Sequence, residues 1–136
     1  MFWGDLLEKE TKPLSNQKSV LVIDDDKAVL TSLVRVLERN GFHADTAETG
    51  REAIEKANGQ HYDVVLVDLR LPDMDGIEVL SKANLPGAVK IMLTGYPSLV
   101  SGVQAMDKGV DAYLRKPVRP EELIGLVKAK LTQHKT

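Results

Sequence analysis

The chain has 136 residues, which is enough for one domain with a buried core. Its net charge is −2 with 28% charged residues, so it lacks the basic excess that direct nucleic-acid binding needs. Cysteine is absent, which excludes disulfides and thiolate chemistry; with no membrane-length apolar run and no signal peptide, we expect a cytoplasmic location without membrane contact.

The first 17 residues are predicted to form an N-terminal extension, residues 1–17. Phe2, Trp3, Leu6 and Leu7 would share one face of a short amphipathic helix, and a linker containing proline and serine would follow. A disordered leader is the alternative reading of this segment. The remaining residues are expected to form a single domain.

Short apolar runs alternate with amphipathic helical patterns through this domain. Runs that are apolar at successive positions are typical of strands buried on both faces of a parallel sheet. Such runs predict strands over 20–23, 42–47, 64–67, 89–93 and 111–114. Helical spacing of apolar residues predicts helices over 27–39, 50–58, 77–83, 98–107 and from about residue 120 onward. This alternation predicts an α/β fold, a doubly wound (βα)5 parallel sheet with helices on both faces.

Residues that could take part in chemistry directly follow four of the predicted strands. Asp24-Asp25-Asp26 follows the first, Asp68 the third, Thr94 and Gly95 the fourth, and Lys116 the fifth. In such folds the ligand lies outside the carboxyl ends of the strands, so these side chains are expected at one edge of the sheet. Crowded carboxylates repel one another, and a hard divalent cation bound by oxygen ligands would offset their charge. The sequence therefore predicts a metal-dependent, phosphate-handling site.

Four segments make this chain resemble the receiver domains of two-component response regulators. They follow predicted strands in the order of that family and span residues 20–26, 63–76, 92–95 and 113–117. The resemblance covers residues 18–134, which we therefore expect to be a receiver domain. It implies a flavodoxin-like sheet with strand order 2-1-3-4-5, an order that periodicity alone does not give.

The resemblance also implies a role for each acid at the predicted site. Asp68 would be the nucleophile that takes a phosphoryl group from a histidine kinase or a phosphotransfer protein. Asp24, Asp25 and Asp68 would bind Mg²⁺ together with the backbone carbonyl of Arg70. Lys116 would pair with Asp68 at rest and with a phosphoryl oxygen afterwards.

A second group of residues would switch or tune the site, again by resemblance. Thr94 would move to hydrogen-bond the phosphoryl group, and the ring of Tyr113 would then turn inward. Arg70 and Tyr96 would flank the phosphoryl group and lengthen the life of the acyl phosphate, while Gly95 leaves room for the phosphoryl donor. The output face of the family, formed by the fourth helix, fifth strand and fifth helix, is where a homodimer would form.

Other polar residues are expected to be structural. Asp26 is interpreted as an N-cap rather than a direct metal ligand. Asp73 and Asp75 lie in the segment Pro-Asp-Met-Asp-Gly, which favours a turn and a helix cap. The three histidines show no spacing typical of a metal or phosphorelay site and are expected at the surface.

The favoured function is a phosphorylation-activated signalling switch, which is not an enzyme beyond catalysing its own phosphorylation and dephosphorylation. One alternative is a haloacid-dehalogenase-type (HAD-type) Mg²⁺-dependent aspartyl phosphatase; its motif Asp-x-Asp-x-Thr/Val fails at Ala28. The other alternative is a degenerate receiver that acts only as a binding module. The intact acids, threonine and lysine of the predicted site count against it.

Overall fold

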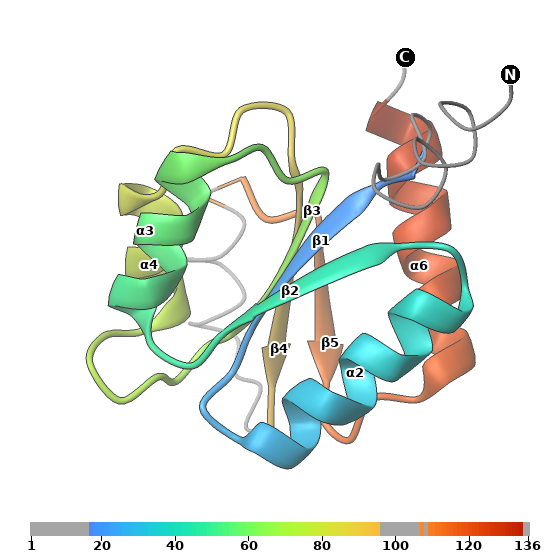
Figure 1. Ribbon diagram of the computed structural model, residues 1–136, viewed down its shortest axis with the longest axis horizontal. Helices are drawn as coiled ribbons and strands as arrows, with labels where there is room; N and C mark the ends of the chain where they lie inside the picture. Colours follow the sequence, from blue (N-terminus) through green and yellow to red (C-terminus); the bar gives the residue numbers. More distant parts are fainter. Residues whose placement is uncertain (1–16, 96–106, 108, 135–136) are drawn as a thin grey trace, which may run out of the picture.

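The structure, a computed structural model, describes residues 17–95, 107 and 109–134. Within this part of the chain there are five strands: β1 (Ser19–Ile23), β2 (His43–Ala47), β3 (Val64–Asp68), β4 (Val89–Thr94) and β5 (Ala112–Arg115). All neighbouring strands pair in parallel, in the order β2-β1-β3-β4-β5 (Figure 1). The predicted α/β fold and its strand order 2-1-3-4-5 are confirmed.

Four helices accompany these strands in the described residues: α2 (Lys27–Arg39), α3 (Gly50–Gly59), α4 (Gly76–Lys82) and α6 (Pro120–His134). The helix predicted over 98–107 lies outside the described residues apart from position 107, and the predicted extension lies outside them up to residue 16. No helix in the described ranges is long and apolar enough to span a membrane.

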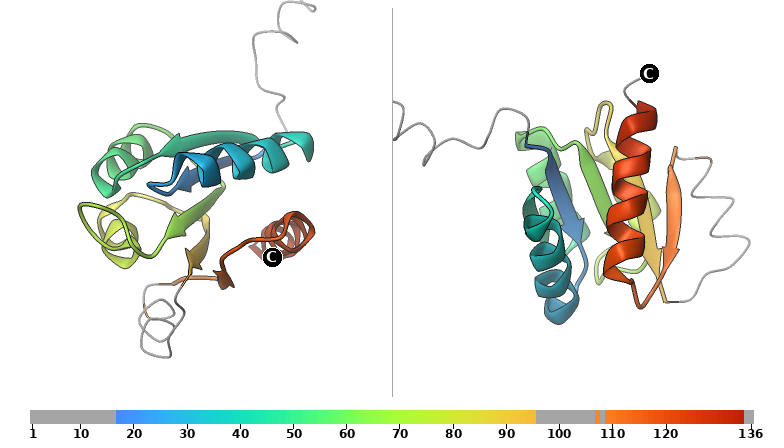
Figure 2. Two further views of the ribbon diagram at one scale, coloured as in Figure 1. Left: turned by 90° about the horizontal axis from the view of Figure 1, so that it is seen from below. Right: turned by 90° about the vertical axis from the view of Figure 1, so that its right-hand side faces the viewer.

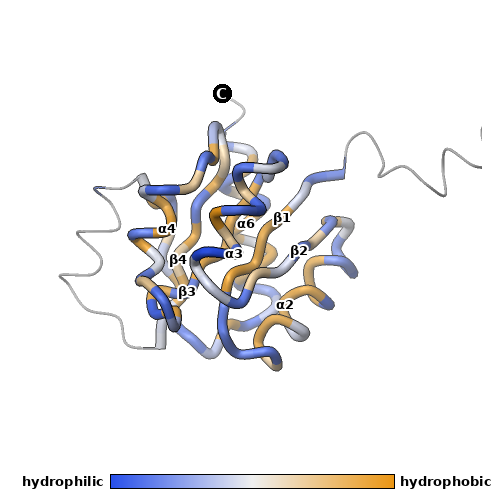
Figure 3. Tube along the Cα trace, turned by 60° about the vertical axis from the view of Figure 1, so that its left-hand side comes forward, coloured by the Kyte–Doolittle hydropathy of each residue, from blue (hydrophilic) through white to orange (hydrophobic). Residues whose placement is uncertain are grey.

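The helices cover both faces of the sheet, as a doubly wound fold requires. Helices α2 and α6 lie on one face, and α3 and α4 lie on the other (Figure 2). Along β1, Val20 and Val22 pack towards α2 and α6, whereas Leu21 and Ile23 pack towards α3 and α4. Because both faces of β1 are buried, all four residues from Val20 to Ile23 are apolar (Figure 3).

Two predicted caps hold the starts of helices near the carboxyl edge of the sheet. The Asp26 side chain accepts hydrogen bonds from the backbone N–H groups of Ala28 and Val29, so it is the N-cap of α2 as predicted. The Asp75 side chain accepts from the N–H of Glu78 and caps α4. Both carboxylates therefore bind free N–H groups in the first turn of a helix.

The three histidines lie at the surface, as predicted, and each contacts a nearby carboxylate. At the end of α6, His134 Nε2 lies 2.8 Å from Asp111 Oδ1, and Nδ1 lies 3.3 Å from the Gly87 carbonyl oxygen. Asp111 also accepts a hydrogen bond of 2.8 Å from the backbone N–H of Lys90. The hydrogen bond with Asp111 is the main reason that the pKa of His134 is raised above its usual value of 6.5.

This contact predicts a pH-dependent contribution to stability. Because the folded pKa of His134 is raised, its stabilisation is fully present below the unfolded pKa and is lost as pH rises through the folded pKa. His134→Ala is therefore expected to lower Tm more at about pH 5.5 than at about pH 8.5, by the equivalent of a few tenths of a kcal/mol for a surface pair. Thermal melts at both pH values test this, and the difference between the two decrements should become smaller when the substitution is made in Asp111→Asn, which leaves only the contact with Gly87. An equal Tm decrement at both pH values would contradict the prediction.

Candidate functional site

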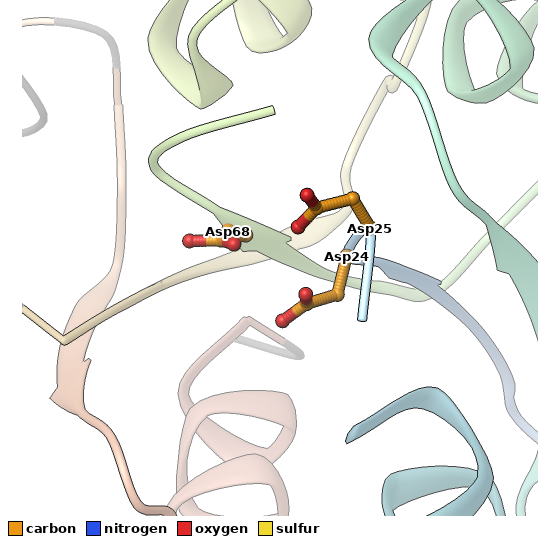
Figure 4. Close-up of side chains that lie close together, drawn as sticks. All are labelled: Asp24, Asp25 and Asp68. Carbon is orange, nitrogen blue, oxygen red and sulfur yellow. The ribbon is translucent and has the colours of Figure 1, made fainter. Parts of the chain in front are cut away.

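Three carboxylates meet at the carboxyl edge of the sheet. Asp24 and Asp25 follow β1, and Asp68 is the last residue of β3; one carboxylate oxygen from each lies within 4.8 Å of those of the other two (Figure 4). β1 and β3 are parallel neighbours, with Ile23 opposite Val67, and their carboxyl ends therefore lie side by side. The structure thus brings together the three acids that the sequence predicts at one edge.

The burial of these acids is unequal. Asp24 is 0% exposed and Asp68 is 7% exposed, whereas Asp25 is exposed to solvent. Asp24 Oδ1 accepts a hydrogen bond of 3.0 Å from the N–H of Asp26, and Asp68 Oδ1 accepts one of 3.3 Å from the N–H of Arg70. Backbone groups of the two adjoining loops therefore orient the two buried carboxylates.

Lys116 supplies a positive charge between the two buried acids. Its Nζ donates to Asp24 Oδ2 at 2.6 Å and to Asp68 Oδ2 at 3.1 Å. The lysine directly follows β5, and its backbone N–H donates to the carbonyl oxygen of Thr94 at 2.8 Å. The pairing with Asp68 is the contact implied by the resemblance, while the shorter contact with Asp24 was not anticipated.

The pKa shifts of the site follow from burial and from these contacts. Burial raises the pKa of Asp68, and the neighbouring charge of Asp24 adds to the shift, although Lys116 opposes both. Burial alone would lower the pKa of Lys116, but the hydrogen bond and charge of Asp24, together with Asp68, raise it overall. Lys116 is therefore charged at neutral pH, and a negative charge on Asp68 is less favourable in the folded protein than in water.

The composition of the site fits a hard divalent cation. Three carboxylates face one ammonium group, which leaves an excess of negative charge around partly buried oxygen atoms. Oxygen-only ligands are those that Mg²⁺ and Ca²⁺ prefer, and Mg²⁺ needs few protein ligands because it keeps several waters. Asp24, Asp25 and Asp68 are thus able to hold such a cation.

The predicted switch and tuning residues lie around this cluster as far as they are described. Thr94, the last residue of β4, is buried, and Gly95 next to it is exposed; a Cβ added there would meet no atom within 4 Å in the described residues. Arg70 is exposed on the loop after β3. Tyr96 lies outside the described residues.

Tyr113 lies in β5, and its ring packs on the apolar cluster shared with α3 and α4. Its hydroxyl oxygen is buried and has no hydrogen-bond partner among residues 17–95, 107 and 109–134. The predicted role of Tyr113 as a switch stays a prediction.

The loop between β3 and α4 makes one connection that the sequence reasoning missed. Asp73, expected to serve the local turn, accepts hydrogen bonds from the backbone N–H groups of Gly50 and Arg51 at the start of α3. The partners lie 23 and 22 positions away, so no local pattern marks them. The contact becomes visible only in the folded structure, where this acid lies beside the two N–H groups of α3 that the N-cap Thr49 does not bind.

Comparison with known proteins identifies the family. The family model of the response regulator receiver domain matches residues 20–128, which is most of the chain. The chain belongs to this family. Receiver domains are signalling switches of two-component systems, and this membership counts against the HAD-type phosphatase alternative.

Three relatives illustrate the similarity of this receiver domain to known proteins. It is 39% identical over 118 residues to the transcriptional regulatory protein ResD of Bacillus subtilis (strain 168), covering 86% of this chain and 49% of ResD. The chain thus spans about half the length of this curated relative. A CheY-like receiver domain protein from Methanospirillum hungatei JF-1 superposes with a TM-score of 0.84 at 40% identity, covering 88% of this chain and 97% of the other.

The third relative is a response regulator from Burkholderia pseudomallei, solved with a phosphorylated aspartic acid, a calcium ion and citrate. It superposes with a TM-score of 0.78 at 31% identity, covering 88% of this chain and 71% of the other.

Proposed function

We propose that this receiver domain is a phosphoacceptor: Asp68 takes a phosphoryl group from the phosphohistidine of a histidine kinase or phosphotransfer protein. The observation that carries the proposal is the position of Asp68, which lies within reach of two further carboxylates and 3.1 Å from the ammonium group of Lys116. In this proposal Asp24, Asp25, Asp68 and the backbone carbonyl of Arg70 hold Mg²⁺. The phosphorylated aspartic acid of the Burkholderia relative supports it.

The transfer is a single displacement at phosphorus. A carboxylate oxygen of Asp68 attacks the phosphorus atom, the new O–P bond forms as the P–N bond of phosphohistidine breaks, and the departing imidazole nitrogen takes up a proton. A carboxylate is a weak nucleophile, so the rate depends on positioning and on neutralisation of charge at the phosphoryl oxygens. When bound, Mg²⁺ supplies positive charge for those oxygens.

Lys116 is the side chain that would neutralise charge on the phosphoryl oxygens. At rest it lies between Asp24 and Asp68, where its long flexible stem carries a compact charge. Once Asp68 is an acyl phosphate, the phosphoryl oxygens carry the negative charge, and the ammonium group moves to them. The loss of the contact between Lys116 and the Asp68 carboxylate is thus the first change that the modification causes.

The signal then passes to the output face. Thr94 moves to hydrogen-bond the phosphoryl group, and the ring of Tyr113 then turns inward. Phosphorylation thus shifts β4 and β5 from a resting to an active arrangement. Partners read the face that includes β5 and α6, and a homodimer through this face is one form of output. Arg70 and Tyr96 slow the loss of the phosphoryl group by limiting the approach of water. The cytoplasmic location remains a prediction from the sequence.

Phosphorylation by a small-molecule donor tests the proposal. Incubation with acetyl phosphate or phosphoramidate is expected to add one phosphoryl group per chain when Mg²⁺ is present and none when EDTA is present, as measured by intact-protein mass spectrometry. Continuous release of inorganic phosphate without a modified protein would instead support the phosphatase alternative. Absence of modification with both donors, at saturating Mg²⁺, would favour a degenerate receiver used only for binding.

A further inference from the structure

We propose that Asp73 is a positioning residue for the cation: it fixes the loop after β3 against α3 and thereby sets the place of the Arg70 carbonyl. The inference rests on the proposed function, because it concerns the Mg²⁺ ligand set proposed above. It assigns to Asp73 a role that differs from the local turn expected from the sequence.

The first observation is the bidentate contact of Asp73 with the start of α3. Its Oδ1 accepts from the N–H of Gly50 at 2.8 Å, and its Oδ2 accepts from the N–H of Arg51 at 2.9 Å. The remaining N–H of this first turn, that of Glu52, donates to Oγ1 of the N-cap Thr49 at 3.1 Å. The helix therefore divides its free N–H groups between its own N-cap and a side chain from the loop after β3.

Direct packing beside this contact joins the same two segments. Gly50 is buried, and a Cβ added to it would lie 2.4 Å from Cγ of Met74, the residue after Asp73. The loop therefore lies directly on the backbone of α3, and only glycine leaves room for the Met74 side chain at this point. The contact is a close-packed junction with two hydrogen bonds beside it.

The other end of the loop is fixed to the sheet at the site itself. The N–H of Leu69 donates to the Leu93 carbonyl oxygen at 2.9 Å, and the N–H of Gly76 donates to the Leu69 carbonyl oxygen at 2.7 Å. A Cβ on Gly76 would lie 2.4 Å from the backbone oxygen of Asp68, so the two ends of the loop close tightly on each other.

Arg70 lies between these two anchors. It follows Asp68 by two positions and precedes Asp73 by three, and it forms an isolated bridge with Asp75 across the loop. In so short a segment the carbonyl of Arg70 has little freedom while both anchors hold. Loss of the two Asp73 hydrogen bonds leaves only the packing of Met74 to hold this side of the loop on α3, which gives the Arg70 carbonyl more freedom relative to the acids.

The charge of Asp73 favours the same contact. The hydrogen bonds from the N–H groups of Gly50 and then Arg51 lower the pKa of Asp73, so it is a carboxylate at neutral pH. A negative charge at the first turn of α3 also interacts favourably with the positive end of the helix dipole. Both oxygens are thus charged acceptors for the two N–H groups.

The test compares Mg²⁺ binding by wild-type protein with that of three variants, measured by calorimetric titration. In Asp73→Ala the Mg²⁺ Kd is expected to rise about 10-fold, at the lower end of the effects seen when a group that orients a metal ligand is removed. Thr49→Ala is the matched control because it removes the other cap of the same helix end without touching the loop. It is expected to lower Tm and to leave the Mg²⁺ Kd unchanged.

Asp73→Asn separates position from charge. Its amide oxygen still accepts one of the two hydrogen bonds, so we expect a Kd between those of wild type and Asp73→Ala, and the amide NMR shifts of Gly50 and Arg51 should report the retained contact. This variant also serves as the test if Asp73→Ala does not fold. The inference is overturned if the two Asp73 variants have equal Kd values at low salt and if both match wild type when all three proteins are measured at high salt. That result would show an effect of charge only.

Two further outcomes distinguish the inference from the proposed function. If wild type binds Mg²⁺ and Asp73→Ala binds it equally well, or if Thr49→Ala weakens binding by the same factor, Asp73 is only a helix cap and the inference is wrong. If wild type itself binds no Mg²⁺, the proposed function fails and the inference fails with it.

Discussion

Asp68→Asn is expected to abolish phosphoryl acceptance while leaving the protein folded. The amide cannot act as the carboxylate nucleophile, so modification by acetyl phosphate with Mg²⁺ should fall below detection in intact-protein mass spectra. Its oxygen still accepts a hydrogen bond from Lys116, and its shape is nearly that of aspartate, so the packing of the site is kept. The substitution therefore separates chemistry from structure.

The same variant is also expected to be more stable than wild type at neutral pH. Burial and then the charge of Asp24 raise the pKa of Asp68 above the usual 3.8, so ionised Asp68 is less favourable in the folded than in the unfolded state. The Tm gain of Asp68→Asn should be full above the folded pKa and should disappear as pH falls below about 3.8. Thermal melts across this range in EDTA measure it.

Asp75→Asn is the control for the predicted loss of phosphoryl acceptance in Asp68→Asn. Asp75 lies on the same loop and caps α4, and asparagine is as good an N-cap as aspartate. This variant should accept the phosphoryl group as wild type does. Modification of Asp68→Asn to the wild-type level would show that another residue is the acceptor.

Lys116→Met is expected to produce the largest loss of stability, and Mg²⁺ should recover part of it. The substitution leaves Asp24, which is 0% exposed, without its 2.6 Å partner and leaves Asp68 without its 3.1 Å partner. Removing one member of a buried ion pair leaves an uncompensated charge, and we expect a loss of about 2–4 kcal/mol in EDTA, since the lysine itself is partly exposed. Urea denaturation with and without Mg²⁺ measures both effects.

The ion pair between Lys82 and Glu78 supplies the matched control. Its N···O distance is 2.7 Å, but both side chains are exposed on α4. Lys82→Met should therefore lower the free energy of unfolding by less than about 1 kcal/mol, with no response to Mg²⁺. A loss in Lys116→Met as small as that of the control, or one that Mg²⁺ does not reduce, would contradict the account of the site.

The sequence predicted those parts of the fold that depend on local pattern. The strands β1 and β3 carry runs of successive apolar residues because their two faces meet different helices, as Val20 and Leu21 do in β1. Asp26 could be recognised as an N-cap from its place between a strand and a helical pattern. The strand order required the family resemblance, because periodicity does not distinguish which parallel strands are neighbours.

The parts that could not be predicted depend on contacts between distant segments. Phe42 was assigned to a strand from its apolar side chain, but it precedes β2 and packs in the core with α2. The short contact of Lys116 with Asp24 depends on how β1 and β5 lie in the folded sheet, 92 residues apart in the chain. The contact of Asp73 with α3 depends in the same way on the docking of a loop on a helix.

Locating the phosphoryl group on the chain tests the central claim most directly. An acyl phosphate on aspartate is reduced by borohydride to homoserine, so reduction of the phosphorylated protein followed by peptide mass spectrometry marks the acceptor. Our account predicts homoserine at position 68 alone, in samples that contained Mg²⁺ and in none that contained EDTA. A reduced residue at any other position, or a phosphoryl group that resists borohydride and alkali, would contradict it.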